Sequence, residues 1–252
     1  MSPPAAAVER LCRKLRLTTP LIAIYDAPPS DAFAPYVEAR GSACCFAFYP
    51  RWLKGETVVF RRGTESPGPP RQGCPGAHRA LGLEASYPPH MAHFLTDGAG
   101  APPGEGLKAS PALAQEFLAA ARPPRLRGAT VLLGPLRLEQ WAAVRSVTFL
   151  VDPDRLAGVM TLAGYWSGDT DLIAAPFSSG CGLLWRSLGE RGRDRPVLGG
   201  TDIAMRRYMP PEILTLSVSP ERFEQMLTIP DGSFLDKPWW NDLLQARGPK
   251  RS

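Results

Sequence analysis

Residues 146–165 read SVTFLVDPDRLAGVMTLAGY and combine the two patterns from which the fold class is predicted. Its apolar run near 146–151 is typical of a strand. From Pro153 to about Tyr165 the spacing of apolar residues favours a helix. Strands interspersed with helices in this way predict an α/β or α+β fold, with a mixed β-sheet and flanking short helices.

Similar patterns continue through the rest of the chain. Ser110 and Pro111 open a helix to about Ala121, because serine caps a helix start and proline suits the first helical position. Ser219 before Pro220 repeats this signal. Further strands are predicted at 21–25, 129–136, 171–175, 196–199 and 213–218, an amphipathic helix at 4–16, and a helix after Cys181.

The composition suits a folded, loop-rich protein. The chain has 252 residues, of which 44% are hydrophobic, and its 28 prolines and 24 glycines exceed the usual proportions. We therefore expect short strands and helices separated by many turns. A single domain is predicted over residues 1–245, with a subdivision near residue 125 as the alternative and a disordered tail at 246–252.

Charge and hydropathy indicate which binding partners and which cellular location to expect. The net charge is +5, and arginines cluster at 122–127 and 191–195, where they would suit phosphate or carboxylate groups. No aromatic residues interleave with these clusters, so nucleic-acid binding is not expected. The N-terminus lacks a signal-peptide pattern, and no apolar run reaches the roughly 18 residues of a membrane span. We expect a cytoplasmic protein without a membrane segment.

The five cysteines are the main candidates for chemistry. An odd number in a chain without a signal peptide favours reduced thiols over a disulfide scaffold. Cys12 is expected only to pack on its helix. No CxxC pair occurs, so a metal site would need cysteines that converge from distant segments. The chain also lacks GxSxG, GxGxxG and GxxxxGK[ST] motifs, which argues against a serine hydrolase, a dinucleotide site and a P-loop.

Residues 73–78, GCPGAH, form the most informative local motif. If Pro75 is the first helical residue, Cys74 is the N-cap, and the helix dipole favours its thiolate form. His78 follows four residues later, close to the same helical face, as a second ligand or as a base toward the sulfur. The alternative is an N-cap cysteine beside a solvated histidine.

Two other cysteine segments have distinctive surroundings. Cys44 and Cys45 begin an apolar segment that runs to Tyr49. If this segment is a strand, only one of the two sulfurs can face a site. Cys181 lies in the small-residue turn SSGCG at 178–182, which leaves the backbone open to close approach by a ligand. Buried structural thiols are the alternative in each case.

Three segments together resemble the bacterial and archaeal family known as domain of unknown function 169. They are Cys44-Cys45-Phe46, the block GCPG at 73–76 that continues to ALGL at 80–83, and the glycine-rich stretch ending in Arg206-Arg207-Tyr208. The resemblance covers most of the chain. It implies no established activity.

The resemblance does imply a set of cofactor ligands. Members carry cysteines at positions that match one of the vicinal pair, Cys74 and Cys181, a set that suits an iron–sulfur cluster or another thiolate-bound cofactor. A further cysteine of the family falls here at Gly200. The fourth ligand would then come from His78 or from the second cysteine of the pair.

Three functions remain open from the sequence. The first is a protein that binds an iron–sulfur cluster, a haem or a metal ion. The second is an enzyme that uses Cys74 as a nucleophile or redox thiol, with Arg206 and Arg207 gripping an acidic substrate. The cofactor ligands of the first function would be Cys45, Cys74 and Cys181, with His78 or Cys44.

The third function is an accessory module that binds a small molecule or a partner protein, with cysteines that only pack. Trp239 and Trp240 lie near the C-terminus and would dock such a partner. The favoured interpretation is that they cap the core of their own domain.

Overall fold

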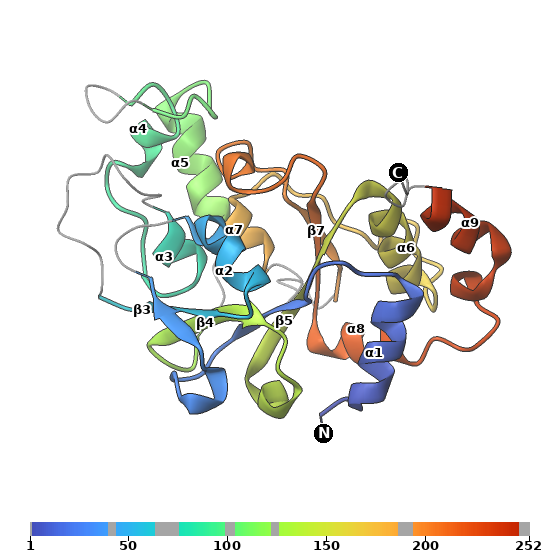
Figure 1. Cartoon of the computed structure of the whole chain (residues 1–252). Helices are drawn as coiled ribbons and strands as arrows, with labels where there is room; N and C mark the ends of the chain where they lie inside the picture. The colour runs from blue at the N-terminus through green and yellow to red at the C-terminus, as the bar shows by residue number, and fades with distance from the viewer. Residues whose placement is uncertain are drawn as a thin grey trace, which may run out of the picture.

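A seven-stranded mixed sheet forms the centre of the part of the chain that the structure describes (Figure 1). The structure is a computed structural model and describes residues 2–39, 44–63, 76–98, 104–121, 126–185 and 194–246. The strand order is β2-β3-β4-β1-β5-β7-β6, and only the β2/β3 pair is parallel. The strands are β1 (Ile22–Tyr25), β2 (Tyr36–Glu38), β3 (Thr57–Arg61), β4 (Thr130–Pro135), β5 (Val144–Val151), β6 (Val197–Gly199) and β7 (Leu214–Val218).

The two faces of the sheet build separate cores, because alternate side chains of a strand point to opposite sides. On β5, Val147 and Phe149 belong to one buried cluster, whereas Leu150 belongs to the other. On β1, Ala23 and Ile24 divide in the same way. We call the first side the helix face and the second the thiol face, because the second cluster includes two of the cysteines.

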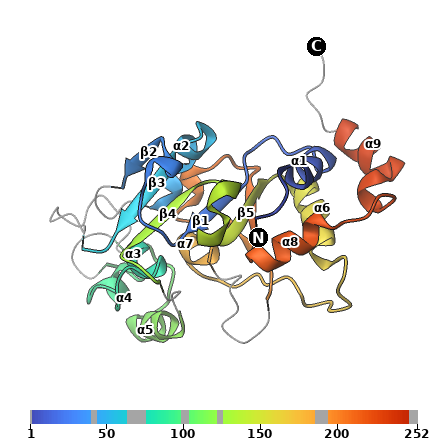
Figure 2. The same ribbon diagram turned by 90° about the horizontal axis from the view of Figure 1, so that it is seen from below.

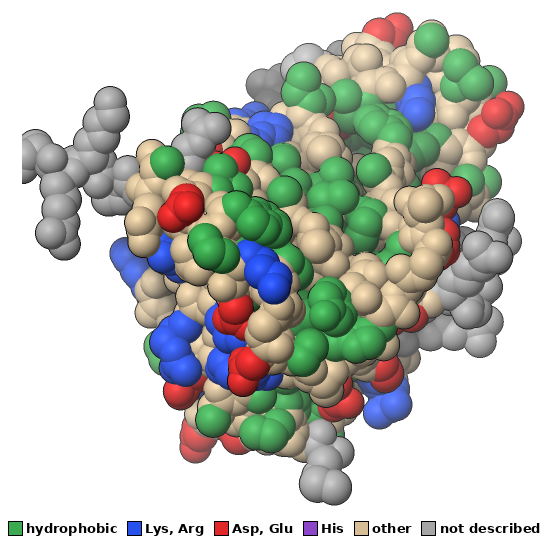
Figure 3. Space-filling view, turned by 90° about the vertical axis from the view of Figure 1, so that its right-hand side faces the viewer, with side chains coloured by type: hydrophobic (Ala, Val, Ile, Leu, Met, Phe, Trp, Pro, Cys, Tyr) green, Lys and Arg blue, Asp and Glu red, His purple; other side chains and the backbone are tan. Residues whose placement is uncertain are grey.

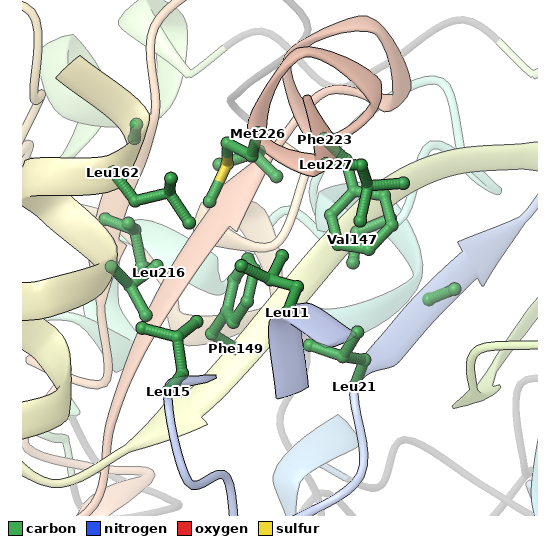
Figure 4. Packing of buried hydrophobic residues seen from close by; sticks show 14 of the residues in the cluster. Leu11, Leu15, Leu21, Val147, Phe149, Leu162, Leu216, Phe223, Met226 and Leu227 are labelled. Atoms are coloured by element: carbon green, nitrogen blue, oxygen red, sulfur yellow. The ribbon is translucent and has the colours of Figure 1, made fainter. Parts of the chain in front are cut away.

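Four helices cover the helix face, as Figures 1 and 2 show. They are α1 (Ala5–Lys14), α6 (Pro153–Gly164), α8 (Pro220–Leu227) and α9 (Pro238–Ala246). Asp152 caps α6 and Ser219 caps α8, each accepting a hydrogen bond from a backbone N–H of the first turn. Figure 4 shows Leu11 of α1 and Phe223 and Met226 of α8 packed around Phe149 of the sheet.

Short elements cover the thiol face. They are the 3-10 helix η2 (Cys45–Phe48), α2 (Tyr49–Leu53), α3 (Ala77–Ala80) and α7 (Gly180–Leu183). A smaller cluster beside them joins α4 (Met91–Phe94) to α5 (Pro111–Ala120). The other 3-10 helices are η1 (Asp31–Phe33), η4 (Leu138–Ala143), η6 (Arg206–Tyr208) and η7 (Phe234–Asp236).

The fold confirms the predicted α+β class with a mixed sheet and short helices. The predicted helices at 4–16, 110–121, 153–165 and 220 onward all form, and Ser110 caps α5 through the N–H of Leu113. The strand predicted at 171–175 is wrong. That stretch forms a turn whose single bridge joins Ala174 to Val197, because β6 is an edge strand that offers it only a brief pairing.

The tandem tryptophans divide between core and surface. Trp240 is buried against α6 and donates its indole N–H to the Lys14 carbonyl, which confirms the capping interpretation for this residue. Trp239 is 59% exposed. Figure 3 shows the side of the molecule that carries α6 and α9, where hydrophobic side chains spread across the centre of the view.

Within the described ranges, every helix is too short or too polar to span a lipid bilayer. The predicted single domain over 1–245 stays a prediction. All but the first residue of the tail at 246–252 lie outside the described residues, as do most of both arginine clusters.

Candidate thiol centre

Cys44 and Cys45 lie at the start of η2 and do not form a strand. Cys44 is the N-cap residue, and Cys45 is the first residue of the 3-10 turn. The prediction that a strand would send the two side chains to opposite faces therefore does not apply. The turn is favoured because Pro50, which follows at the start of α2, suits the first positions of a helix. Both sulfurs are thereby directed toward one site.

Cys181 meets the vicinal pair although it lies far away in the sequence. The Cys45 and Cys181 sulfurs are 2.7 Å apart, and both residues are buried in the core of the thiol face. Cys44 hydrogen-bonds to both of these sulfurs and is only partly buried. Folding thus gathers three of the predicted site residues into one cluster, which we call the thiol centre: Cys44, Cys45 and Cys181.

Cys181 is positioned by anchors around the short helix α7. The helix includes the cysteine rather than following it, and Ser179 is its N-cap, with its hydroxyl accepting the Gly182 N–H. The Gly180 N–H donates to the carboxylate of Asp202 at 2.8 Å. At the other end, the buried Ser146 hydroxyl of β5 donates to the Leu184 carbonyl. A helix of this length needs such tertiary anchors, because it makes few hydrogen bonds of its own.

Gly180 allows the close packing beside the sulfurs. A Cβ added there would lie 2.6 Å from the Met205 sulfur and 2.9 Å from the Phe46 ring. Any side chain would force these groups away, so glycine is required by the space and not by its backbone angles. The small-residue turn predicted to admit a ligand instead admits the protein's own side chains.

The sequence predicted that Arg206 and Arg207 would bind an acidic group together. In the structure the two guanidinium groups make different contacts. The Arg206 guanidinium donates to the carbonyls of Gly200, Pro210, Pro211 and Ile213, and it thereby fixes the loop that includes Asp202. These bonds engage its donors with the backbone, so we assign Arg206 a structural role. Arg207 is exposed and stacks its guanidinium 4.9 Å from the centre of the Tyr208 ring.

The pKa values of Cys44 and Cys45 are shifted in opposite directions. Hydrogen bonds from Cys181 and Cys45, helped by the backbone amides of Phe46 and Ala47, hold the pKa of Cys44 well below its usual range. Full burial and the neighbouring sulfurs raise the pKa of Cys45 far above its usual range. Of these two residues, Cys44 therefore favours the thiolate and Cys45 the protonated thiol.

Two acidic residues lie near the centre, and the sequence patterns did not identify either. Burial, the charge of Asp202 and the Cys44 thiolate raise the pKa of Glu105 to about 7, against a smaller opposing effect of Arg207. Glu105 belongs to no recognisable sequence motif. Asp202 lies two residues after Gly200 and accepts the Ala204 N–H, which is a turn signal that does not by itself indicate a site.

The Cys74 motif is described only in its second half. Cys74 and Pro75 lie outside the described residues. Helix α3 begins at Ala77 with Gly76 as N-cap, so the condition that Pro75 is the first helical residue concerns a position outside the described residues. Gly76 stands where an added Cβ would meet the Met91 side chain at 3.1 Å, which favours glycine at this start.

His78 is buried and not solvated. It is 3% exposed, and its Nε2 atom has no hydrogen-bond partner among the described residues. Helix α3 packs beside α7, which includes Cys181. A buried nitrogen without a partner costs about 1–3 kcal/mol, so its retention calls for an explanation.

No group of three or more His, Cys, Asp and Glu side chains is arranged to hold a metal ion in the part of the chain that the structure describes. The predicted metal ligands are Cys45, Cys74 and Cys181. The structure brings the first and third together and does not describe the second.

Comparison with known proteins identifies a family for this chain, and the description of that family names no activity. The sequence profile of a family described as uncharacterised ArCR matches residues 10–228 of the chain. No curated protein and no solved structure matches it. The matched range includes all three residues of the thiol centre.

Proposed function

The chain belongs to the DUF169 family, and we propose that it is a cofactor-binding protein that holds a thiophilic metal ion or an iron–sulfur cluster through converging cysteines. The observation that carries the proposal is the meeting of the Cys45 and Cys181 sulfurs, from segments 136 residues apart, in a buried site that Cys44 also joins. Thiolates are the ligands that such metals prefer.

The charges around the thiol centre support a bound cation. A thiolate is favoured at Cys44, and the acidic side chains of Asp202 and Glu105 lie close enough to act on the same region. Hydrogen bonds favour this thiolate, and the cation that acts on Glu105 is the exposed Arg207, whose opposing effect is smaller than the effects that raise the Glu105 pKa. A metal ion would supply a positive charge and would also favour loss of the remaining thiol protons.

The number of sulfurs favours a multi-thiolate ligand set over haem. A haem iron takes a single cysteine, whereas iron–sulfur clusters and soft metal ions take three or four. Two thiolates on one tetrahedral ion lie roughly 3.8 Å apart for bonds of about 2.3 Å. The 2.7 Å separation of Cys45 and Cys181 is shorter, so loading requires these side chains to rotate apart. Cys74 and His78 are the candidates for a further ligand.

Metal analysis of protein purified without oxygen tests the proposal. We expect bound iron or another thiophilic metal near one site per chain, with charge-transfer absorbance in the visible if the metal is iron. Cys45→Ser and Cys181→Ser should each lose the metal. Cys12→Ser is the matched control, because Cys12 lies on α1 at the helix face and should leave the content unchanged.

A colourless, metal-free preparation that ferrous iron and sulfide, or zinc, fail to reconstitute would contradict the proposal. The cysteines would then be structural, and the accessory module that binds a small molecule or partner protein would become the favoured function. In that case Cys45→Ser and Cys181→Ser would lower stability and leave metal content at zero throughout.

A further inference from the structure

The three sulfurs of the thiol centre differ in their access to solvent. Cys45 is completely buried and Cys181 is 3% exposed, whereas Cys44 is only partly buried. A reagent dissolved in water therefore meets Cys44 first. Solvent access therefore assigns the first step of a thiol–disulfide exchange to Cys44.

The two buried sulfurs are placed for a covalent bond. A disulfide joins its sulfurs at about 2.05 Å, so the 2.7 Å contact between Cys45 and Cys181 closes with a movement of less than about 1 Å. Such a bond would tie η2 to α7 across the thiol face. It would also remove two of the sulfurs from metal binding, because a disulfide sulfur is no longer a thiolate.

We infer that, in the metal-free protein, Cys44 relays oxidation from a low-molecular-weight disulfide to the buried pair, which ends as a Cys45–Cys181 disulfide. This inference rests on the same thiol centre as the proposed function, but it does not require that the centre ever binds a metal. It assigns the three cysteines different tasks: one receives the oxidant and two store the oxidised state.

The relay proceeds in three exchanges. The Cys44 thiolate attacks the small disulfide, forms a mixed disulfide and releases one small thiolate. Cys181 then attacks the Cys44 sulfur, which releases the second small thiolate and forms a Cys44–Cys181 bond. Cys45 finally attacks the Cys181 sulfur and frees Cys44 as a thiolate.

The sum of these exchanges is balanced. Two electrons pass from the protein to the small disulfide, and the protons of Cys45 and Cys181 end on the two small thiols. Cys44 returns to its starting state. The contacts allow each exchange, since Cys44 hydrogen-bonds to Cys181 and Cys181 contacts Cys45.

The test uses the full chain, reduced and stripped of metal with a chelator, and glutathione disulfide as the probe. Alkylation of the remaining thiols, followed by digestion and mass spectrometry, identifies which sulfurs are joined. We expect a peptide pair linked through Cys45 and Cys181, with Cys44 alkylated. Cys44→Ser should slow formation of this link by roughly tenfold or more. Cys12→Ser should not change the rate.

Cys45→Ser removes the last nucleophile of the relay. It is a second test variant, which keeps the inference falsifiable if Cys44→Ser does not fold. It should stop the reaction at a Cys44–Cys181 disulfide or at a glutathione adduct on Cys44. Oxidation of Cys44→Ser at the wild-type rate would overturn the inference. So would a stable adduct on Cys44 of the wild-type protein with no Cys45–Cys181 link.

Metal content, measured separately on protein purified without oxygen, keeps this inference distinct from the proposed function. A protein that never binds metal but oxidises through Cys44 supports the relay alone. A protein that binds metal but shows no such oxidation after stripping overturns the relay alone.

Discussion

The two faces of the sheet are built by different means. On the helix face, four helices of 8 to 12 residues, two of them with side-chain caps, cover one continuous apolar cluster. On the thiol face, helices of four or five residues are held by tertiary hydrogen bonds around Asp202, Arg206 and Ser146. Both arrangements bury apolar side chains, and the second adds anchors that position the helix of Cys181. The two faces of one sheet are thus covered by elements held in different ways, by local caps on one side and by tertiary hydrogen bonds on the other.

The largest effect should come from the centre of the helix face. Phe223 is completely buried, and its ring centre lies 5.9 Å from that of Trp141 and 6.1 Å from that of Phe149. Phe223→Ala should lower the free energy of unfolding by about 3–5 kcal/mol, because it removes a large buried ring and leaves a cavity. Urea denaturation measures this. A loss below about 1 kcal/mol would show that the helix face is not the main source of stability.

A second variant overfills the same face. Gly158 on α6 approaches Trp240 so closely that an added Cβ would lie 2.3 Å from the indole ring. Gly158→Ala should cost about 1–3 kcal/mol by overpacking. Gly164→Ala, on the same helix, is the control, because its Cβ would meet only Leu172 at 3.8 Å. Equal thermal stability of the two variants would contradict this packing.

On the thiol face, Asp202 should matter more to the site than to overall stability. Asp202→Ala removes the acceptors of the Gly180 and Ala204 N–H groups and should cost about 1–2 kcal/mol. Loss of this anchor should also loosen α7 and speed alkylation of Cys181 under native conditions. The measurement is peptide-resolved labelling over time. Unchanged labelling of Cys181 would show that the loop does not hold the helix in place.

The pH dependence of stability tests the environment of Glu105. Its pKa is raised from the usual 4.5 to about 7, so the folded state holds this proton more tightly than the unfolded chain does. The resulting stabilisation is fully present below about pH 4.5 and is lost as the pH rises through 7. Glu105→Gln should therefore be more stable than the wild type at pH 8, with the difference disappearing near pH 4.5. Denaturant titrations at several pH values measure it, and a constant difference would contradict the assignment.

The smallest effect is expected at the edge of the sheet. Arg61 of β3 forms an ion pair with Glu38 of β2 at 2.7 Å, and both side chains are about 40% exposed. A double-mutant cycle of Arg61→Ala and Glu38→Ala should give a coupling energy of about 0.2–1 kcal/mol, because water screens exposed pairs. A larger coupling would mean that charge, and not burial alone, stabilises this end of the sheet.

Sequence patterns correctly predicted the helices and strands whose formation depends on residues close together in the chain. The strand and helix at 146–165, and the helices that begin after Ser110 and Ser219, follow from apolar periodicity and from caps whose hydrogen bonds lie within one turn. The strands β2 and β3 were missed. Each has five residues or fewer, and their parallel pairing depends on a connection through η2 and α2 that no local pattern indicates.

The candidate site was predictable in its residue types but not in its geometry. The cysteines stood out by chemistry, yet the meeting of Cys45 with Cys181 depends on the placing of η2 and α7, which tertiary contacts determine. The same reasoning applies to Arg206. An arginine that binds backbone carbonyls and an arginine that binds a substrate look alike in a sequence, and only the positions of the acceptors distinguish them.

The central position of β1 has a consequence for synthesis on the ribosome. Ile24 of β1 pairs with Leu133 of β4 on one side and with Ser146 of β5 on the other. Strand β1 is therefore synthesised long before β4 and β5, and it remains an unpaired apolar segment until they are made. Contacts so distant along the chain slow folding and prolong exposure of such segments. A nascent chain that ends before β5 cannot close the middle of its sheet, and chaperone protection should be most valuable during that interval.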